Sequence, residues 1–247
     1  MINQETLNQL REMHLTAMAA DIRERCAQPS FLEMDFGRQM DMIVDKEWHR
    51  RKEKNVNEHI RQAMFCYSHA SSTDIDYTPE RGLDRRKINE LDQCDYILNG
   101  ANVIIMGATG VGKTYLACAL GNSACRARYT CRYIRMPSLT DELELAKDSG
   151  IFQKTIQQYT KPKLLILDEW LLNPLSEHGI GNVFELMESR YSERKSTIFC
   201  TQIDVPDWLT LLGNNLLAES IMDRIIHNAV KILLKGDSMR KKAAPGG

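Results

Sequence analysis

"GATGVGKT", residues 107–114, follows directly on the apolar run "NVIIM", residues 102–106. An uninterrupted apolar run of this length is typical of a strand that is buried on both faces of a parallel sheet. Glycine is costly to order, so three glycines beside such a strand indicate a backbone that must turn sharply or approach a ligand closely. The stretch fits G-x-x-x-x-G-K-[ST] without a mismatch. The sequence therefore predicts a loop whose backbone amides hold a polyphosphate.

The residue types of this loop suit a nucleotide bound with Mg²⁺. Lys113 is expected to reach the β- and γ-phosphates as a point charge, and Thr114 is expected to supply a hydroxyl to the metal. A helix that begins at Lys113 adds positive potential at its N-terminus. A glycine-rich turn that binds nothing is the alternative interpretation. The residues predicted to bind ATP in this stretch are Gly107, Ala108, Thr109, Gly110, Val111, Gly112, Lys113, Thr114 and Tyr115.

A second apolar run, "KLLILDEW" at residues 163–170, carries two carboxylates at its end. Open α/β sheets bind ligands at the carboxyl edge of their strands, which is where Asp168 and Glu169 are expected to lie. Asp168 is predicted to hold Mg²⁺ and Glu169 to polarise an attacking water, which favours hydrolysis over transfer to another acceptor. A solvated turn or a helix cap is the alternative. Gln202, at the end of "STIFCTQ", is a candidate for contact with the γ-phosphate or the attacking water, unless it only starts the next loop.

Strand and helix patterns alternate from about residue 100 onward. This alternation predicts an α/β fold, a parallel sheet flanked by helices. The last 30 residues are expected to be mostly helical. The predicted strands are 102–106, 131–136, 163–170 and 196–202, and the predicted helices between them include 113–126 and 180–193.

The first part of the chain has a different pattern. Residues 3–26 predict one amphipathic helix and residues 31–70 a second helical stretch with a strongly charged middle. A polar, turn-rich stretch follows. The predicted division is a helical N-terminal domain at 1–70, a linker at 71–95, an ATPase domain at 96–240 and a flexible tail at 241–247.

Composition limits the function classes. The 247 residues carry a net charge of −1, so a strongly basic nucleic-acid-binding domain is excluded and any contact with DNA must come from local patches. The seven cysteines form no C-x-x-C pair, which favours reduced thiols and a cytoplasmic protein. The sequence contains no apolar run of about 18 residues, so no membrane span is expected.

Taken together, the motifs resemble an AAA+ ATPase, and more closely the IstB family, the helper ATPases of bacterial insertion sequences that are related to the DnaC helicase loader. The similarity spans nearly the whole chain. Besides the phosphate loop and "DEW", it rests on "LNQLREMHLTAMAADI", "DVPDWLTLLG" and "LAESIMDRIIHNAVKILLKGDSMRKK", in that order. Only about 20 residues follow "MDR", so the helical lid of AAA+ proteins is expected to be reduced or absent.

The resemblance implies roles for two arginines. Arg224 in "MDR" corresponds to the arginine finger, which acts on the nucleotide of a neighbouring subunit, and Arg240 in "SMRK" corresponds to the sensor-2 arginine of the same subunit. A guanidinium suits both roles because its fork spreads developing negative charge over two oxygens. The alternatives are an ion pair of Arg224 with Asp223 or Glu219 on its own helix, and a frayed basic tail around Arg240.

The resemblance also implies a function: a cytoplasmic bacterial ATPase that assembles as a ring or spiral on duplex DNA and delivers it to a cognate transposase. A DnaC-like loader of a replicative helicase, a small-molecule phosphotransferase and a scaffold that hardly hydrolyses ATP are the alternatives.

The candidate DNA contacts lie in two basic stretches, and neither stretch carries a motif that reads bases, so contacts with phosphates are expected. The first stretch is instead a solvated helix face if its charges pair internally. The candidate residues are Lys46, Arg50, Arg51 and Lys54 in the first stretch and Arg135 at the end of "RARYTCRYIR" in the second.

Overall fold

The computed structural model describes residues 3–239, which belong to two compact units, Met1–Glu58 and His59–Gly247. The division falls inside helix α4 (Phe36–Ala63), ahead of the boundary predicted at residue 70. The segment predicted as a linker contains helix α5 (Arg85–Asp92), whose Ile88 and Leu91 are buried in the core of the second unit. Residues 71–95 therefore differ from the expected linker, because Ile88 and Leu91 pack in the core of the second unit.

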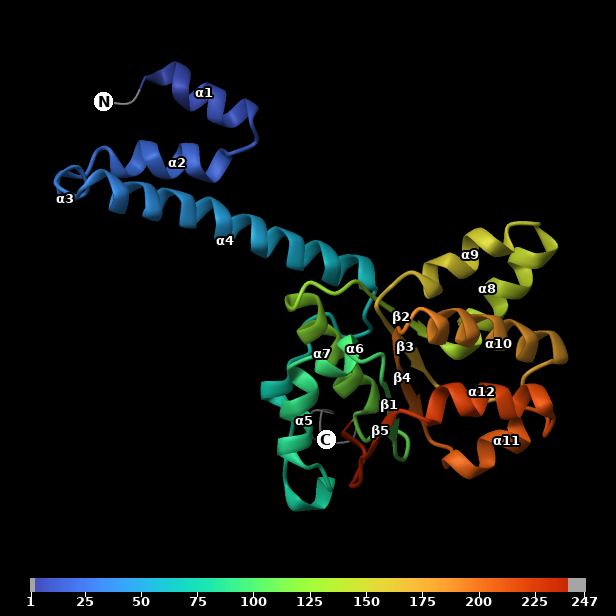
Figure 1. Ribbon diagram of the computed structural model, residues 1–247. Coiled ribbons are helices and arrows are strands. Elements are labelled where there is room, and N and C mark those ends of the chain that lie inside the picture. Colours follow the sequence, from blue (N-terminus) through green and yellow to red (C-terminus); the bar gives the residue numbers. More distant parts are fainter. Residues whose placement is uncertain (1–2, 240–247) are drawn as a thin grey trace, which may run out of the picture. The chain divides into compact units, whose positions relative to one another are not determined.

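The N-terminal unit is helical, as predicted, but residues 3–26 form two helices instead of one. The chain turns at His14, whose φ of 59° is left-handed and incompatible with a continuous helix. No glycine or proline marks this break in the sequence. A small apolar cluster of Leu7, Ala19, Ile22, Phe31 and Ile43 holds the helices together. The helices of this unit are α1 (Gln4–Glu12), α2 (Thr16–Arg25), α3 (Pro29–Leu32) and the first part of α4 (Figure 1).

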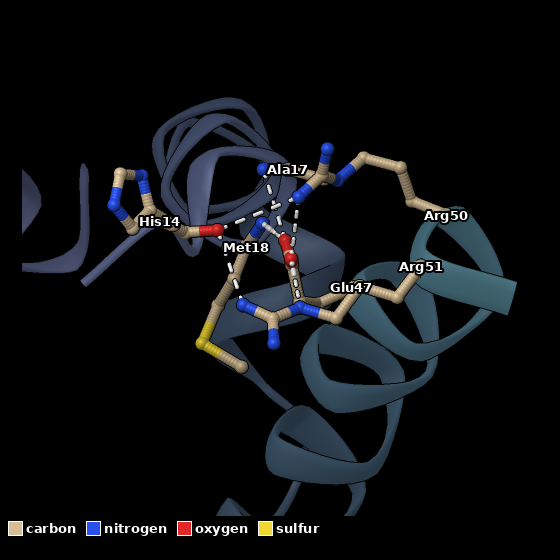
Figure 2. Close-up of polar contacts among 6 residues, drawn as sticks. All are labelled: His14, Ala17, Met18, Glu47, Arg50 and Arg51. Carbon is tan, nitrogen blue, oxygen red and sulfur yellow. Dashed lines mark hydrogen bonds and ion pairs between the residues drawn. The ribbon is translucent and has the colours of Figure 1, made fainter. Parts of the chain in front are cut away.

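A buried carboxylate, Glu47 of α4, caps the start of α2 (Figure 2). The residue before α2, Leu15, has no side chain that accepts a hydrogen bond, so the first amides of the helix need another acceptor. Glu47 Oε2 accepts from the amides of Ala17 and Met18 at 3.0 and 3.1 Å, and its Oε1 accepts from Arg50 and Arg51 at 2.7 and 2.8 Å. The carboxylate thereby ties two helices together.

The hydrogen bonds to Glu47 change its pKa. Burial alone would raise the pKa of this carboxyl, but the hydrogen bonds from Arg50, Arg51 and the Met18 amide outweigh burial and lower the pKa from 4.5 to about 2. A lowered pKa in the folded state contributes stability that is fully present above about pH 4.5 and is lost as the pH falls towards 2.

The second unit is built on a sheet in which all strand pairs are parallel, with the order β2-β3-β4-β1-β5 in residues 3–239. The register sets Arg135, the last residue of β2, beside Asp168, the last residue of β3. The parallel register thereby places the polar carboxyl ends of β2 and β3 side by side. The strands are β1 (Asn102–Met106), β2 (Cys131–Arg135), β3 (Leu164–Asp168), β4 (Ser196–Thr201) and β5 (Ala229–Leu233).

Alternate residues of the central strands are buried in separate cores on the two faces of the sheet. Ile105 packs with α5, α6 (Asp95–Leu98) and α7 (Lys113–Arg126), whereas Ile104 packs with the helices of the other face. Figure 1 shows this layered arrangement. The helices of the second face are α8 (Met136–Asp148), α9 (Phe152–Thr160), α10 (Glu177–Ser192), α11 (Trp208–Leu211) and α12 (Leu216–Ile226).

The four predicted strands and the parallel sheet are confirmed, but the described residues after α12 include a strand where helix was expected. Strand β5 follows α12 and pairs with β1 along its whole length. Residues 234–239 are the only described residues after β5, and the predicted tail at 241–247 lies outside the described part of the chain. Within residues 3–239, no helix is both long enough and apolar enough to span a bilayer.

Replacing Glu47 by Gln is expected to lower the free energy of unfolding by about 1–2 kcal/mol at pH 7, since the amide loses charge-assisted hydrogen bonds to two partly exposed arginines. Urea denaturation followed by circular dichroism measures this difference. The gap between Glu47→Gln and the wild type should stay constant above about pH 4.5 and narrow below it. Glu53→Gln, on an exposed position of the same helix, is the matched control. A gap that widens on acidification would contradict the assignment.

Candidate active site

The predicted phosphate loop connects β1 to α7, and the C-terminal segment of the described chain packs against it. Gly107 has a φ of 150°, and a Cβ at this position would lie 2.4 Å from the carbonyl oxygen of Leu234. At Gly110, with a φ of 80°, a Cβ would lie 2.2 Å from Ser238 Oγ. Both sites therefore require glycine for conformation and for space. The amide of Met239 donates to the Gly110 carbonyl at 2.9 Å.

Lys113 lies at the first position of α7 and curls back over the loop. Its Nζ donates to the carbonyl oxygens of Gly107 and Ala108, both at 2.8 Å. The ammonium is therefore held at the mouth of the loop, at the N-terminus of a helix of 14 residues. Ammonium and helix dipole together create positive potential at one place, which suits a polyphosphate.

Asp168 joins three elements at the carboxyl edge of the sheet. Its Oδ2 accepts hydrogen bonds from Thr114 Oγ1 of α7 at 2.8 Å and from the Tyr133 hydroxyl of β2 at 2.9 Å. Asp168 is only 5% exposed. Burial and the neighbouring Asp168 charge both raise the pKa of Tyr133, so the phenol stays protonated and donates. Sequence reasoning predicted that Thr114 and Asp168 would meet, but it did not identify Tyr133.

Glu169 follows β3 in a left-handed conformation, with a φ of 56°. Non-glycine residues adopt this conformation at a cost, and the surrounding structure must hold them there. Here the fully buried Trp170 does so, because its ring packs edge-on against Phe199 at 4.8 Å and Trp208 at 5.6 Å. Its amide also donates to the Cys200 carbonyl at 2.9 Å. The "DEW" sequence thus buries one side chain as an anchor and directs the preceding carboxylate towards the cavity.

An ion pair holds the Glu169 carboxylate. Arg135 donates from Nε and Nη2 to Glu169 Oε2 at 2.9 and 2.7 Å. The side chains are 55% and 29% exposed, respectively. An exposed pair of this kind is worth about 0–1 kcal/mol, so another anion can compete for the arginine. Arg135, predicted as a DNA contact, is therefore also a direct neighbour of the predicted catalytic carboxylate.

Lys113, Thr114, Asp168 and Glu169 line a cavity of about 520 Å³, a size typical of small-molecule sites. Gln202 reaches it from the end of β4, where its Oε1 accepts from Thr109 Oγ1 at 2.6 Å. Part of the cavity lining was not predicted, because it comes from the segment expected to be a linker and, in Tyr67, from the end of the predicted N-terminal domain. The residues of this part include Tyr67, Asp74, Ile75, Asp76, Arg81 and Leu83.

Arg81 holds the phosphate loop through a hydrogen bond to its backbone. It is 6% exposed, and it donates from Nη2 to the Val111 carbonyl and from Nη1 to the Lys235 carbonyl, the latter at 3.3 Å. One buried guanidinium therefore links the loop to the chain after β5. No spacing or motif around "TPERG" distinguishes this arginine in the sequence.

Arg224 lies away from this cavity, on α12. It lines a different cavity together with Asn102 and Thr197, at the amino ends of β1 and β4, whereas the phosphate loop lies at the carboxyl end of β1. Its carboxylate partner is Glu188 of α10, which corrects the alternative of a pair on its own helix, and it also donates to the Ser220 carbonyl at 2.8 Å. The guanidinium is thus held at the opposite end of the sheet from the site of its own chain.

The remaining predicted residues belong to other parts of the chain. The exposed Lys46 and Lys54 lie on α4 in the N-terminal unit, with Arg50 and Arg51, which both contact Glu47. Arg50 and Arg51 also donate to the His14 carbonyl. These two arginines therefore have a structural role, which the sequence pattern did not indicate. Arg240 lies outside the described residues.

Comparison with known proteins identifies relatives over nearly the whole chain. The profile of a family described as "IstB-like ATP binding protein" matches residues 8–245. A protein of Sinorhizobium fredii named as an insertion sequence ATP-binding protein, y4pL, is 36% identical over 98% of this chain and 98% of its own length. The protein named for insertion sequence IS21 of Pseudomonas aeruginosa is 29% identical over 96% of this chain and 87% of its own.

Solved structures share the fold. The DnaC helicase loader matches with a TM-score of 0.60 and 21% identity over 68% of this chain and 98% of its own. DnaI matches with a TM-score of 0.55 and 24% identity, over 69% of this chain and 90% of its own. DnaA from Aquifex aeolicus, bound to AMPPCP, matches with a TM-score of 0.57 and 19% identity over 70% of this chain and 52% of its own. These structures show that the chain has an AAA+ fold. Because the identities are low, the likeness shows the fold alone.

Replacing Gly107 by Ala is expected to weaken the binding of a fluorescent ATP analogue roughly 5–150-fold, because strain of about 1–3 kcal/mol must be relieved by distorting the loop or displacing Leu234. Gly181→Ala is the matched control, since a Cβ there meets nothing within 4 Å. Titration by fluorescence anisotropy measures both variants. Equal affinity of the Gly107→Ala variant and the wild type would contradict the assigned role of the loop.

Proposed function

The chain belongs to the family of IstB-like ATP-binding proteins and is an AAA+ ATPase, and we propose that it acts as the helper ATPase of an insertion sequence. In this proposal it assembles as an oligomer on duplex DNA in the presence of ATP and delivers that DNA to a cognate transposase. The match over residues 8–245, which includes parts of both compact units, carries the proposal.

The cavity residues divide the work of ATP hydrolysis among them. The loop amides and Lys113 bind the phosphates, while Glu169 accepts a hydrogen bond from the water that attacks the γ-phosphorus. Thr114 and Asp168 would hold Mg²⁺, because their hydroxyl and carboxylate oxygens, 2.8 Å apart, are the hard donors that this ion prefers. When bound, the ion neutralises phosphate charge. Gln202 orients the γ-phosphate or the water from the end of β4.

Arg224 supplies positive charge to the site of a neighbouring subunit. A strand of five residues spans roughly 16 Å, and Arg224 lies beyond the far end of the sheet from its own phosphate loop. The arginine therefore suits a heterologous, head-to-tail contact, in which each subunit completes the site of the next one. Hydrolysis then depends on assembly. Arg240, by its resemblance, is proposed to contact the nucleotide within the same subunit.

Arg135 provides a way to couple DNA to hydrolysis. Its guanidinium holds Glu169, and the same guanidinium is exposed enough to bind a DNA phosphate. A phosphate that takes over Arg135 frees the carboxylate to activate water. Because the ion pair is weak, contacts of ordinary strength suffice to break it.

The other DNA contacts are proposed to come from α4. Lys46 and Lys54 are exposed and offer phosphate contacts without base recognition. Each subunit is close to neutral and contributes few contacts, so binding gains its strength from the number of subunits in the oligomer. Affinity should then fall steeply as the salt concentration rises.

Mixing two inactive variants tests the shared site. Lys113→Ala and Arg224→Ala should each abolish DNA-stimulated ATPase activity. In an equimolar mixture, roughly a quarter of head-to-tail interfaces combine an intact Lys113 with an intact Arg224, so about that fraction of activity should return. Release of phosphate measures the result, with duplex DNA present at saturating ATP.

Mixing Lys113→Ala with Glu169→Gln is the control. Lys113 and Glu169 are contributed by the same subunit to one site, so no interface in this mixture contains both intact residues and no activity should return. Full activity of the unmixed Arg224→Ala variant would indicate that each subunit hydrolyses ATP alone, as a small-molecule phosphotransferase would. An inactive mixture of Lys113→Ala and Arg224→Ala would contradict a site shared between subunits.

Replacing Arg135 by Ala is expected to raise the DNA-free ATPase rate by up to about fivefold, the factor that corresponds to an exposed ion pair of about 1 kcal/mol. Stimulation by duplex DNA should decrease in proportion. Arg86→Ala, which removes a more exposed pair with Glu90 on α5, away from the cavity, is the control and should change neither rate. A lower DNA-free rate in the Arg135→Ala variant would show that this arginine assists catalysis.

A further inference from the structure

The cavity that Arg224 lines is positively charged. It has a volume of about 360 Å³ and lies at the amino ends of β1 and β4, at the opposite end of the sheet from the phosphate loop. Among the described residues that line it, none is an aspartate or a glutamate. A concave surface with charge of one sign concentrates ligands of the other sign, so this cavity suits an anion. The cationic residues of its lining are Arg190, Arg194, Lys195 and Arg224.

Two of these cations are occupied by other groups of the protein. Arg190 is 1% exposed, and its guanidinium nitrogens all donate to neutral acceptors, which are the Thr197 hydroxyl and backbone carbonyls. Lys195 is also buried, where it pairs with Glu193 at 2.7 Å and donates to the Thr160 carbonyl at 2.7 Å. Arg190 therefore adds positive potential to the cavity, while direct contacts with an anion must come from the other two arginines of the lining.

Arg194 is available for such a contact and lies beside Arg224. It is exposed, and within residues 3–239 its side chain has no hydrogen-bond or ion-pair partner. Tyr191 connects the two arginines. The Tyr191 carbonyl accepts from the amide of Arg194 at 3.0 Å, and the Arg224 guanidinium carbon lies 5.8 Å from the centroid of the Tyr191 ring. Because both arginines line one cavity, one anion bound there is within reach of both.

The backbone at Arg194 has a conformation that favours glycine. Arg194 follows the C-cap of α10 with a φ of 49°, the left-handed conformation in which many helices end on a glycine. Gly100 makes room for it, because a Cβ at position 100 would lie 3.1 Å from the Cα and Cβ of Arg194. An arginine held where the local conformation favours glycine indicates a use for its side chain.

We propose that Arg194 is a second arginine that acts on the site of a neighbouring subunit, where it contacts the terminal phosphates of the bound nucleotide together with Arg224. This inference rests on the head-to-tail contact proposed above. Two guanidinium groups spread the negative charge that develops on the phosphates over more hydrogen bonds than one group does. Arg224 must first leave Glu188, whereas Arg194 can bind the phosphates without leaving a carboxylate.

Replacing Arg194 by Gly separates the side chain from the fold, because glycine suits the left-handed conformation. The midpoint of thermal unfolding should be unchanged or higher, whereas ATPase activity at saturating ATP and duplex DNA should fall roughly tenfold or more, the loss expected for a hydrogen bond between charged groups. Arg194→Lys keeps the charge without the fork and should retain part of the activity. Full activity of Arg194→Gly, or a loss of activity that accompanies a lower midpoint, overturns the proposal.

Arg128→Gly is the matched control. Arg128 also follows the C-cap of its helix, α7, with a left-handed φ of 68°, and it lines neither the nucleotide cavity nor the cavity of Arg224. The same replacement there should leave the ATPase activity at wild-type level.

Mixtures of variants determine on which side of the interface Arg194 acts. An equimolar mixture of Arg194→Gly and Lys113→Ala should recover about a quarter of the wild-type activity, because roughly that share of interfaces combines both intact residues. A mixture of Arg194→Gly and Arg224→Ala should recover none, since one subunit contributes both arginines. The reverse pattern would assign Arg194 to the site of its own chain and would overturn the proposal.

The same mixtures distinguish a failure of this inference from a failure of the proposed function. If Lys113→Ala is complemented by Arg224→Ala but not by Arg194→Gly, the shared site stands and only the role of Arg194 is wrong. If neither arginine variant complements Lys113→Ala, the site shared between subunits is itself wrong.

Discussion

One carboxylate oxygen at the carboxyl ends of the strands holds the candidate active site together. Asp168 Oδ2 accepts from Thr114 and Tyr133, which lie on α7 and β2, while Asp168 itself ends β3. The start of the helix that carries the phosphate loop is thereby fixed against two neighbouring strands. Because the parallel register aligns the strand ends, the same edge also carries Arg135 and Glu169. The groups proposed to bind phosphate, hold the metal and activate water thus share one buried acceptor.

Arg135 and Arg224, two arginines with proposed roles in hydrolysis, are both held by carboxylates of their own chain. Arg135 pairs with Glu169, and Arg224 pairs with Glu188 while its guanidinium lies over the ring of Phe184 at 5.1 Å. In the proposed function, each guanidinium exchanges its carboxylate for another anion, a DNA phosphate for Arg135 and the nucleotide of a neighbouring subunit for Arg224. In the isolated chain the groups proposed for hydrolysis are therefore already in place, but these two arginines are bound to carboxylates of the same chain. Such an arrangement suits an ATPase whose activity depends on partners.

Much of the nucleotide-binding unit was predictable from sequence because its central strands are continuous apolar runs. Strand β5 was missed because the charged, exposed Lys231 at its centre interrupts the apolar pattern. The break at His14 was missed because neither glycine nor proline marks it. In the site, the meeting of Thr114 and Asp168 follows from local motifs. The contacts of Tyr133 and Arg81 depend on tertiary approach between distant segments, which no spacing encodes.

The buried Glu47 has a consequence for testing the proposed DNA contacts of α4 by mutagenesis. Arg50 and Arg51 complete the capping of α2, so neutralising either one would loosen the N-terminal unit and reduce DNA affinity through misfolding as readily as through a lost contact. Lys46 and Lys54 are exposed on the same helix, and the hydrogen bonds of the Glu47 cap come from other residues. Substitution of these two lysines therefore tests the electrostatic contribution alone. Substitution of Arg50 or Arg51 also changes the fold of the N-terminal unit.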